Sequence, residues 1–271
     1  MNPNFSVKDK VIVITGATGV LGTVMAGSLA KAGAIVGILG RNESKVNAFV
    51  DELQNKGLQA FALVADVLDE AALAKVRESV AQQWGKVDIL LNVAGGNLPG
   101  ATIGPDQSVL DLSADAVKKV MELNYLGTVL PVQAFLPLMI SNKKGNIINI
   151  SSVSAQNPLT RVMGYSSAKA AIDNYTQWLA VELAHKFGEG FRVNAITPGF
   201  FLTEQNRSLL TNTDGSLTSR GNTIKEHTPM NRFGEPDDLT GTLLWLCSDA
   251  SRFVTGVSVP VDGGFSAFSG V

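Results

Sequence analysis

Short runs of apolar, mostly β-branched residues alternate with longer amphipathic stretches along nearly the whole chain. The short runs predict seven strands: Val11–Thr15, Ile35–Leu39, Ala60–Val64, Ile89–Val93, Asn146–Ser151, Arg192–Ile196 and Val257–Pro260. The longer stretches predict six helices: Gly22–Ala32, Glu43–Lys56, Glu70–Trp84, Ala114–Ile140, Ser166–Phe187 and Pro236–Cys247. Because the core strands are apolar at almost every position, we expect a parallel sheet that is buried on both faces. The alternation predicts an α/β fold: one domain, residues 1–271, with a doubly wound seven-stranded sheet and helices on both faces.

Residues 203–234 are the one long stretch without such a pattern, and they are rich in Asn, Thr, Ser and Gly. A loop of this length inside a compact domain usually has a function. We interpret it as a lid over a substrate site; the alternative is a disordered surface insertion.

Composition excludes several classes of partner. The net charge of −2 gives no electrostatic reason to expect nucleic acid or an anionic membrane. The first ten residues do not follow the pattern of a signal peptide, and we expect no apolar run to be long enough to span a bilayer. A cytoplasmic location is therefore predicted. The single cysteine, Cys247, follows an apolar run and is interpreted as a buried small residue, the alternative being a reactive thiol. His185 and His227 lack a second ligand at metal-binding spacing, so no metal site is predicted.

Three glycines, Gly16, Gly19 and Gly22, follow the first predicted strand and open the first predicted helix. A side chain in this turn would block the backbone from approaching a pyrophosphate, which the N–H groups of the helix N-terminus can bind. Glycine is also common in tight strand–helix turns without any ligand. The strand before and the helix after favour a dinucleotide site.

The second predicted strand ends at Leu39 and Gly40, and Arg41 follows. A carboxylate here would bind the adenosine ribose diol and repel a 2′-phosphate. Since a guanidinium stands here instead, NADP(H) is favoured and NAD(H) stays possible. Alternatively, Arg41 stacks on adenine or is only solvated. Asp66, after the third strand, is placed to reach the adenine amino group.

Several segments together match the motifs of one family. They are Thr15, Gly16 and Gly22 in the glycine turn, the segment Asn92–Gly95, the set Asn124, Ser152, Tyr165 and Lys169, and Pro198–Gly199 with Thr203. On these residues the chain resembles the short-chain dehydrogenase/reductase family over nearly its whole length. One departure is the glycine turn, where Gly19 comes one place early and Val20 stands where the family has its middle glycine.

The resemblance implies a Rossmann-type fold and hydride transfer between a nicotinamide cofactor and a hydroxyl or keto group. It implies cofactor contacts at Gly16, Thr18, Gly19, Val20, Leu21, Gly22, Arg41, Asp66, Val67, Asn92, Ala94, Gly95, Tyr165, Lys169, Pro198, Gly199, Phe201 and Thr203.

Tyr165 and Lys169 are four residues apart and project from one helix face if a helix begins near Tyr165. An unperturbed phenol has a pKa of about 10, and a nearby ammonium lowers it toward the range useful for proton exchange. Lys169 would also bind the nicotinamide ribose, Ser152 would bind the substrate oxygen, and Asn124 would position a water in a proton relay. The same Tyr-x-x-x-Lys spacing arises by chance on many amphipathic helices, and Asn124 could simply satisfy backbone groups.

A narrower resemblance concerns the substrate. The segments around Gly95–Pro99 and Pro158–Val162, the start of residues 203–234 and the C-terminal tail are similar to the short-chain type of D-mannonate oxidoreductase (fructuronate reductase). Such a sugar acid needs a cation for its carboxylate and donors for its hydroxyls. The substrate candidates are Asn97, Ser152, Arg161, Asn206 and Arg207, with Arg161 and Arg207 for the carboxylate and with Arg232 and His227 closing the lid. For the arginines the alternative is an exposed ion pair.

Other functions remain open at this point. One is reduction of another carbonyl, such as a 3-oxoacyl thioester or a different sugar acid, for which an apolar channel would replace the arginines. Another is a non-catalytic redox sensor, against which the four catalytic residues argue. The predicted helices Ala114–Ile140 and Ser166–Phe187 are apolar on more than one face, which favours a homo-oligomer. The resemblance implies a homotetramer with the tail Phe265–Val271 at an interface.

Overall fold

A computed structural model describes residues 3–202, 207 and 209–270 of the chain. Its seven strands form one parallel sheet in the order β3-β2-β1-β4-β5-β6-β7, which confirms the predicted fold. The strands are β1 (Val11–Thr15), β2 (Ile35–Gly40), β3 (Ala60–Val64), β4 (Ile89–Asn92), β5 (Gly145–Ile150), β6 (Phe191–Pro198) and β7 (Ser258–Val261). Their bounds agree with the predicted strands to within two residues, because each core strand is buried almost throughout.

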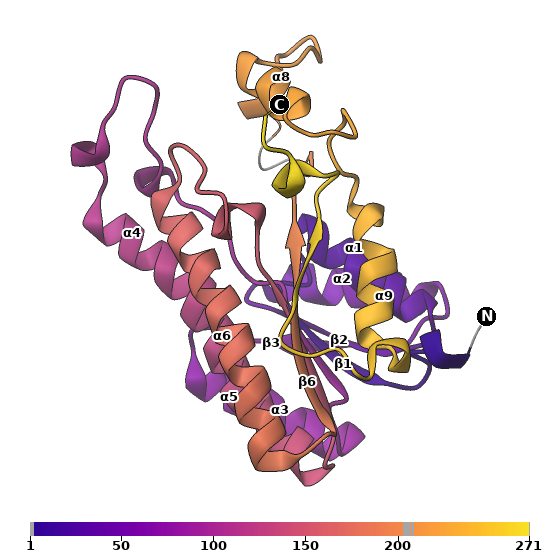
Figure 1. Cartoon of the computed structure of the whole chain (residues 1–271). Coiled ribbons are helices and arrows are strands. Elements are labelled where there is room, and N and C mark those ends of the chain that lie inside the picture. The colour runs from indigo at the N-terminus through magenta and orange to yellow at the C-terminus, as the bar shows by residue number, and fades with distance from the viewer. Residues whose placement is uncertain (1–2, 203–206, 208, 271) are drawn as a thin grey trace.

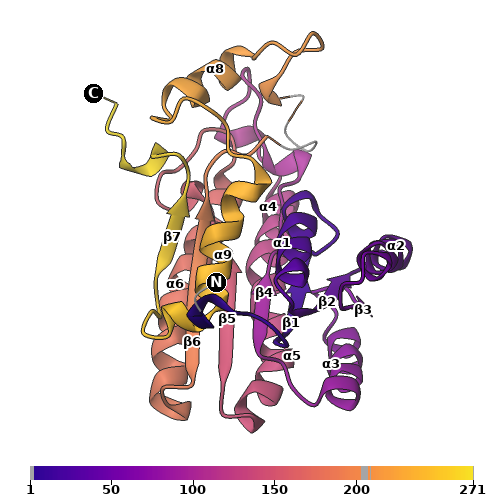
Figure 2. The same cartoon turned by 90° about the vertical axis from the view of Figure 1, so that its right-hand side faces the viewer.

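Helices cover both faces of the sheet (Figures 1 and 2). One layer packs its apolar side chains with Ile12 and Ile14 of β1 and holds α1 (Val20–Lys31), α2 (Glu43–Asn55) and α9 (Thr240–Cys247). The other packs with Val11 and Val13 and holds α3 (Glu70–Trp84), α5 (Gly127–Ser141) and α6 (Met163–Phe187). Alternate residues of β1 therefore face opposite layers, as expected for a sheet buried on both sides.

The helix predicted over Ala114–Ile140 is divided in the structure. It consists of α4 (Ala114–Met121), a π-helical turn (Glu122–Leu126) and α5. By length and composition Ala114–Ser141 could cross a membrane, which corrects the expectation that no stretch comes close. In the fold, however, Val132, Phe135 and Met139 of α5 are buried in the core. The apolar character of this helix is thus explained by its packing against the sheet.

The long stretch predicted to lack structure contains the helix α8 (Ser219–Glu226). Thr218 caps it by accepting a hydrogen bond from Gly221 N, and its own residue Ile224 and the preceding Leu210 are buried. We call residues 207 and 209–234 the cap. Figures 1 and 2 show it beyond the carboxyl ends of the strands. The expectation of a patternless loop was therefore wrong over α8, whereas the role of a lid stays a prediction.

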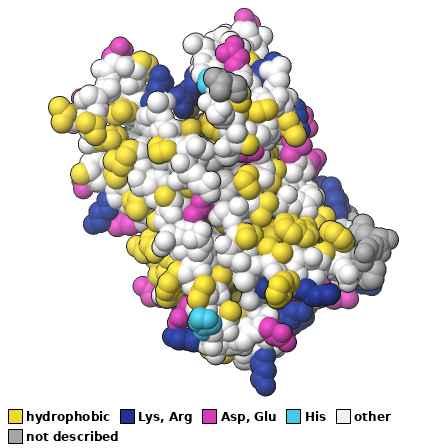
Figure 3. Space-filling view, in the orientation of Figure 1, with side chains coloured by type: hydrophobic (Ala, Val, Ile, Leu, Met, Phe, Trp, Pro, Cys, Tyr) yellow, Lys and Arg dark blue, Asp and Glu magenta, His cyan; other side chains and the backbone are white. Residues whose placement is uncertain are grey.

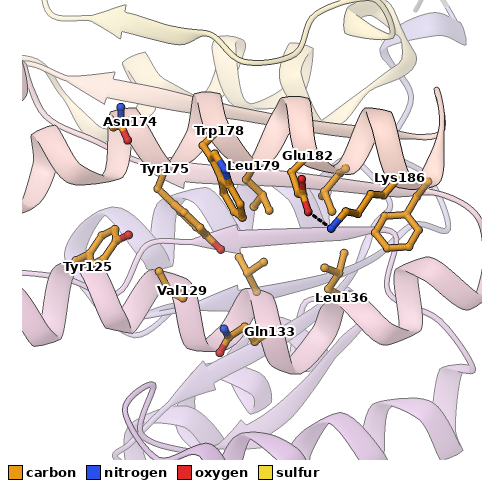
Figure 4. A pocket seen from close by; sticks show the side chains of 13 residues that line it. Tyr125, Val129, Gln133, Leu136, Asn174, Tyr175, Trp178, Leu179, Glu182 and Lys186 are labelled. Atoms are coloured by element: carbon orange, nitrogen blue, oxygen red, sulfur yellow. Dashed lines mark ion pairs between the residues drawn. The ribbon is translucent and has the colours of Figure 1, made fainter.

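An apolar groove runs between α5 and α6 on the solvent side of these helices (Figure 4). It has a volume of about 560 Å³, and its aromatic lining is Tyr125, Tyr175 and Trp178. Tyr175 and Trp178 stack with ring centroids 6.1 Å apart, yet Trp178 remains 57% exposed. One end carries the ion pair of Lys186 with Glu182. The molecule thus presents a large apolar surface away from the carboxyl ends of its strands.

Candidate active site

The switch point of the sheet lies between the carboxyl ends of β1 and β4, and we refer to the region outside these two strand ends as the crevice. These strands are neighbours, but the chain leaves β1 toward β2 on the opposite side, and ligands bind at such switch points of parallel sheets. Thr15 Oγ1 accepts hydrogen bonds from Val93 N and Ala94 N, both 3.2 Å long. Gly16 has a φ of +62°, and a Cβ there would lie 2.7 Å from Ala94 N. The two predicted cofactor segments therefore touch through their backbones.

The glycine turn leaves the N-terminus of α1 open. Its N-cap residue is Gly19, which has no side chain to accept hydrogen bonds from the first turn. Gly19 N donates to Gly16 O at 3.0 Å, and a Cβ on Gly22 would lie 2.3 Å from that same oxygen. Val20, which stands in the place of the usual glycine, is 39% exposed. The turn can therefore hold a diphosphate on backbone N–H groups despite the shifted glycine.

The residues predicted for the adenosine end follow the neighbouring strands β2 and β3. Arg41 directly follows β2 and is exposed, and it makes no hydrogen bond or ion pair within the described part of the chain. Asp66 is half-buried and accepts a hydrogen bond from Leu68 N at 3.0 Å, while Val67 is buried. Thr18 packs against Gly40: a Cβ on Gly40 would lie 3.3 Å from Thr18 Oγ1. Thr18, Arg41 and Asp66 thus lie on the β2 side of the crevice.

Lys169 is buried on α6, and its ammonium donates to Ile150 O at the end of β5 over 2.7 Å. Its Nζ lies 5.5 Å from the centroid of the Tyr165 ring. Burial lowers the pKa of Lys169 to about 8, an effect that the nearby carboxylate of Asp173 opposes. An amine held near neutrality in this way can exchange protons with a neighbouring phenol.

Tyr165 lies in the first turn of α6, which begins at Met163, three residues before the predicted start. Burial raises the pKa of the Tyr165 phenol, while a hydrogen bond with the Ser152 side chain lowers it. The expected net lowering by Lys169 is therefore not present in this structure, because desolvation of the phenolate is the larger effect. Ser152 follows β5, and its Oγ accepts from Ser154 N at 3.2 Å. The sheet edge and α6 together hold the two hydroxyls side by side.

Asn124 occupies the π-helical turn between α4 and α5. Its Nδ2 donates to Gly96 O at 2.7 Å and to Val120 O at 2.8 Å, and its Oδ1 accepts from Gly96 N at 3.1 Å. A Cβ on Gly95 would lie 2.7 Å from this Oδ1 and 3.4 Å from Lys169 Nζ. Asn124 thus fixes the loop after β4 beside Lys169, and its predicted role in positioning a water stays a prediction.

The segment after β6 places Pro198 and Gly199 at the edge of the crevice, where Gly199 N donates to Val261 O at 3.0 Å. Phe201 is buried in the core, and its ring packs against Gly234, which closes the base of the cap. A cofactor contact at Phe201 would therefore involve its main chain. Thr203, predicted to bind the nicotinamide end, lies outside the described residues.

The predicted substrate residues are brought together only in part. Asn97 Nδ2 donates to Thr102 Oγ1 at 2.8 Å, and Asn97 Oδ1 accepts from Leu98 N, so this side chain shapes its own loop. Arg161 is half-buried four residues before Tyr165, whereas Arg207 is exposed in the cap. Asn206 lies outside the described residues.

The sequence interpretation missed Arg220 of α8. Its Nη1 lies 3.4 Å from Thr160 Oγ1, next to Arg161 in the chain. Burial, and to a lesser extent the charge of Arg161, lower the pKa of Arg220. Only the cap fold brings them together, and the polar sequence around Arg220 gave no signal for it.

The two residues predicted to close the lid, Arg232 and His227, both have partners in the structure. Arg232 is paired with Asp238 through two hydrogen bonds of 2.6 and 3.0 Å. His227 Nδ1 lies 3.0 Å from Thr223 O, and its ring packs edge-on against Phe268 of the C-terminal tail. Both therefore brace the cap, and their part in closing a lid stays a prediction.

Cys247 is buried as expected, and burial raises the pKa of its thiol to about 12, which makes it a poor nucleophile. In the part of the chain that the structure describes, no three His, Cys, Asp or Glu side chains converge as a metal site would require.

The chain is similar to known proteins over nearly its whole length. Residues 16–266 match the family model described as enoyl-(acyl carrier protein) reductase. The chain is 48% identical to the uncharacterised oxidoreductase UxuB of Bacillus subtilis, and the match covers 97% of this chain and 96% of that protein.

Two solved structures share the fold at nearly full length. A protein from Haemophilus influenza, provisionally assigned as a D-mannonate oxidoreductase and containing NAD, is 43% identical, with a TM-score of 0.91 and 98% coverage of each chain. A gluconate 5-dehydrogenase from Burkholderia cenocepacia, in complex with NADP and tartrate, is 30% identical, with a TM-score of 0.87 and 98% coverage of each chain.

Proposed function

This chain belongs to the short-chain dehydrogenase/reductase family and is an NAD(P)-dependent oxidoreductase, and we propose that it interconverts D-mannonate and D-fructuronate. The observation that carries this substrate is the 43% identity to the Haemophilus protein over 98% of both chains, a span that includes the cap. Half-buried arginines beside the crevice support it, because a sugar acid needs a cation for its carboxylate.

The residues around the crevice fit a nicotinamide dinucleotide. The open N-terminus of α1 and the backbone contact at Gly16 suit its diphosphate, and Lys169 beside Gly95 suits its nicotinamide ribose. When bound, the nicotinamide donates or accepts the hydride. All other steps of the reaction fall to side chains of this chain.

In the reductive direction, Ser152 holds the substrate carbonyl oxygen by a hydrogen bond and Tyr165 donates a proton to that oxygen. Because the pKa of Tyr165 is raised, its phenol carries this proton at neutral pH. Lys169 stabilises the phenolate that forms and returns a proton to it. Asn124 holds the Gly95–Gly96 loop in place throughout. In the oxidative direction the same groups act in reverse.

The first test is a spectrophotometric assay of the purified protein. We expect D-fructuronate to be reduced with NADPH or NADH, and D-mannonate to be oxidised with NADP⁺ or NAD⁺. A panel of other sugar acids and a 3-oxoacyl thioester serves as the comparison. Turnover of the thioester in preference to every sugar acid would contradict the proposed substrate.

We further propose that NADP(H) is preferred, since the exposed Arg41 follows β2 where a carboxylate would repel a 2′-phosphate. Arg41→Ala is then expected to raise the Kd of NADPH about 10-fold, the loss of one charge-assisted hydrogen bond, and to leave the Kd of NADH within 2-fold. Fluorescence titration with both cofactors measures this. Equal weakening of both would mean that Arg41 does not contact a 2′-phosphate.

We also propose a homo-oligomer, with a tetramer favoured, in which the groove between α5 and α6 is covered by another subunit. The apolar lining and the exposed Trp178 support this assembly. Light scattering should then give four times the 28.6 kDa mass of the chain. Trp178→Glu, which would bury a charge there, is expected to yield smaller species. A monomeric wild-type protein at micromolar concentration would contradict the proposal.

Finally, we propose a cytoplasmic location. The single cysteine is buried and makes no disulfide, and the activity depends on a nicotinamide cofactor. Fractionation of the native host, followed by immunoblotting, tests this location.

A further inference from the structure

An arginine of the cap contacts the loop before α6 next to a second arginine in that loop. Arg161 belongs to that loop, and Arg220 lies in the first turn of α8. Both are half-buried, and burial together with the charge of Arg161 lowers the pKa of Arg220. Arg220 Nη1 lies 3.4 Å from Thr160 Oγ1, so the positive charge of the cap stands beside the segment that carries Arg161, and an anion bound between them would relieve the repulsion of like charges.

No carboxylate of the described residues offsets these charges. Neither arginine forms an ion pair with any residue in the described ranges, whereas Arg232, also in the cap, is paired with Asp238. The one hydrogen bond of Arg220 is the weak contact with Thr160 Oγ1 at 3.4 Å. Most of its donors are therefore available to a ligand.

The backbone holds Arg161 in position for this role. Its φ of +76° lies in the left-handed region, which is unfavourable for a residue with a side chain. Arg161 O accepts a hydrogen bond from Ile103 N at 3.1 Å, which ties this loop to the segment after β4. Tyr165 follows one helical turn later. Strained residues held by their surroundings are concentrated at binding sites.

The surface has a notch at this end of the molecule. Figure 3 shows Lys and Arg side chains gathered in it, between the α4 side and the cap. A ligand bound there would contact both the fixed loop and the cap.

We propose that Arg161 and Arg220 together form the binding site for the carboxylate of the substrate, an open-chain hydroxy acid. This proposal rests on the proposed function and adds to it which residues recognise the acid. The carboxylate joins α8 of the cap to the loop before Tyr165, and it thereby holds the cap closed over the reacting carbonyl. Arg207, which is exposed, is not part of this pair.

The test compares D-fructuronate with D-fructose, a ketose that carries CH₂OH in place of the carboxylate. Arg220→Gln and Arg161→Gln are each expected to raise the KM for D-fructuronate on the order of 10- to 100-fold, the usual effect of losing one charge-assisted hydrogen bond. The KM for D-fructose and the Kd of the cofactor should stay within 2-fold. Lys225→Gln, on the same helix, removes the same charge outside the pair and should change none of these values.

The outcomes separate this proposal from the proposed function. If the wild-type protein reduces D-fructuronate and the two arginine variants do so with unchanged KM, the pair is refuted and the substrate stands. If no sugar acid is turned over, calorimetry of D-mannonate with the cofactor-loaded protein decides. Binding that Arg220→Gln weakens by at least about 10-fold supports the pair, and binding that is absent or unaffected overturns it.

Discussion

Tyr165→Phe is expected to lower kcat by about 100- to 10,000-fold, the range that proton transfer by a positioned acid contributes. The substitution removes one oxygen atom and keeps the ring in the first turn of α6. Lys169 would still donate to Ile150 O, and the loop after β4 would still be held by Asn124. Steady-state kinetics with D-fructuronate and NADPH, or with the best substrate of the panel, measure the loss.

The control for Tyr165→Phe is the binding of the cofactor. The Kd of the cofactor should change by less than 2-fold, since the ring and Lys169 stay in place. Ser167→Ala, an exposed position on the same helix, should leave kcat unaltered. Activity within a few-fold of wild type in Tyr165→Phe would show that another group supplies the proton.

Gly22→Ala is expected to weaken the binding of NADPH and NADH alike, on the order of 10- to 100-fold, as overpacking by one methyl group costs about 1–3 kcal/mol. The new Cβ would lie 2.3 Å from Gly16 O and 2.9 Å from Ala17 Cα, so the turn after β1 would have to open. Both neighbours are backbone atoms and cannot move aside independently. Fluorescence titration of the folded variant gives the two dissociation constants.

The same helix offers a matched control. Gly27→Ala makes the identical change on α1, where no atom beyond the neighbouring helix backbone lies within 4 Å of the new methyl group. It should leave cofactor binding unaltered and stabilise the fold by roughly 0.5–1 kcal/mol, because alanine favours the helix. If both variants bound the cofactor as tightly as the wild type, the glycine turn would not be the diphosphate site.

The strands could be predicted from the sequence because burial on both faces leaves a continuous apolar signal, as at Val11–Thr15. The helices could be predicted less completely than the strands. The π-helical turn around Asn124 keeps the apolar period of an α-helix, so nothing in the pattern marks it. In α8, Thr218 gives a capping signal, but the helix itself is mostly polar and only Gly221 and Ile224 are buried. In eight residues that are mostly polar, the hydrophobic periodicity is too weak to predict a helix.

The four candidate catalytic residues could be placed from their motif and spacing, yet their electrostatics could not. Proximity alone favoured a lowered pKa at Tyr165, whereas the structure shows that burial raises it. The balance between a neighbouring charge and desolvation depends on packing around the ring. Likewise, the meeting of Arg161 with Arg220 depends on how the cap folds back over the loop before α6, and no local pattern encodes that contact.

The C-terminal tail has a practical consequence for anyone who prepares this protein. Phe265 packs edge-on against Phe200 with centroids 5.1 Å apart, Phe268 packs against His227, and Met230 N donates to Gly263 O at 3.0 Å. The tail therefore braces the cap, and Figures 1 and 2 show both at the same end of the molecule. An affinity tag fused there would load the contacts that hold the cap. The described N-terminal residues lie on the side of the molecule, away from the cap, so the N-terminus is the safer place for purification handles and surface immobilisation (Figures 1 and 2).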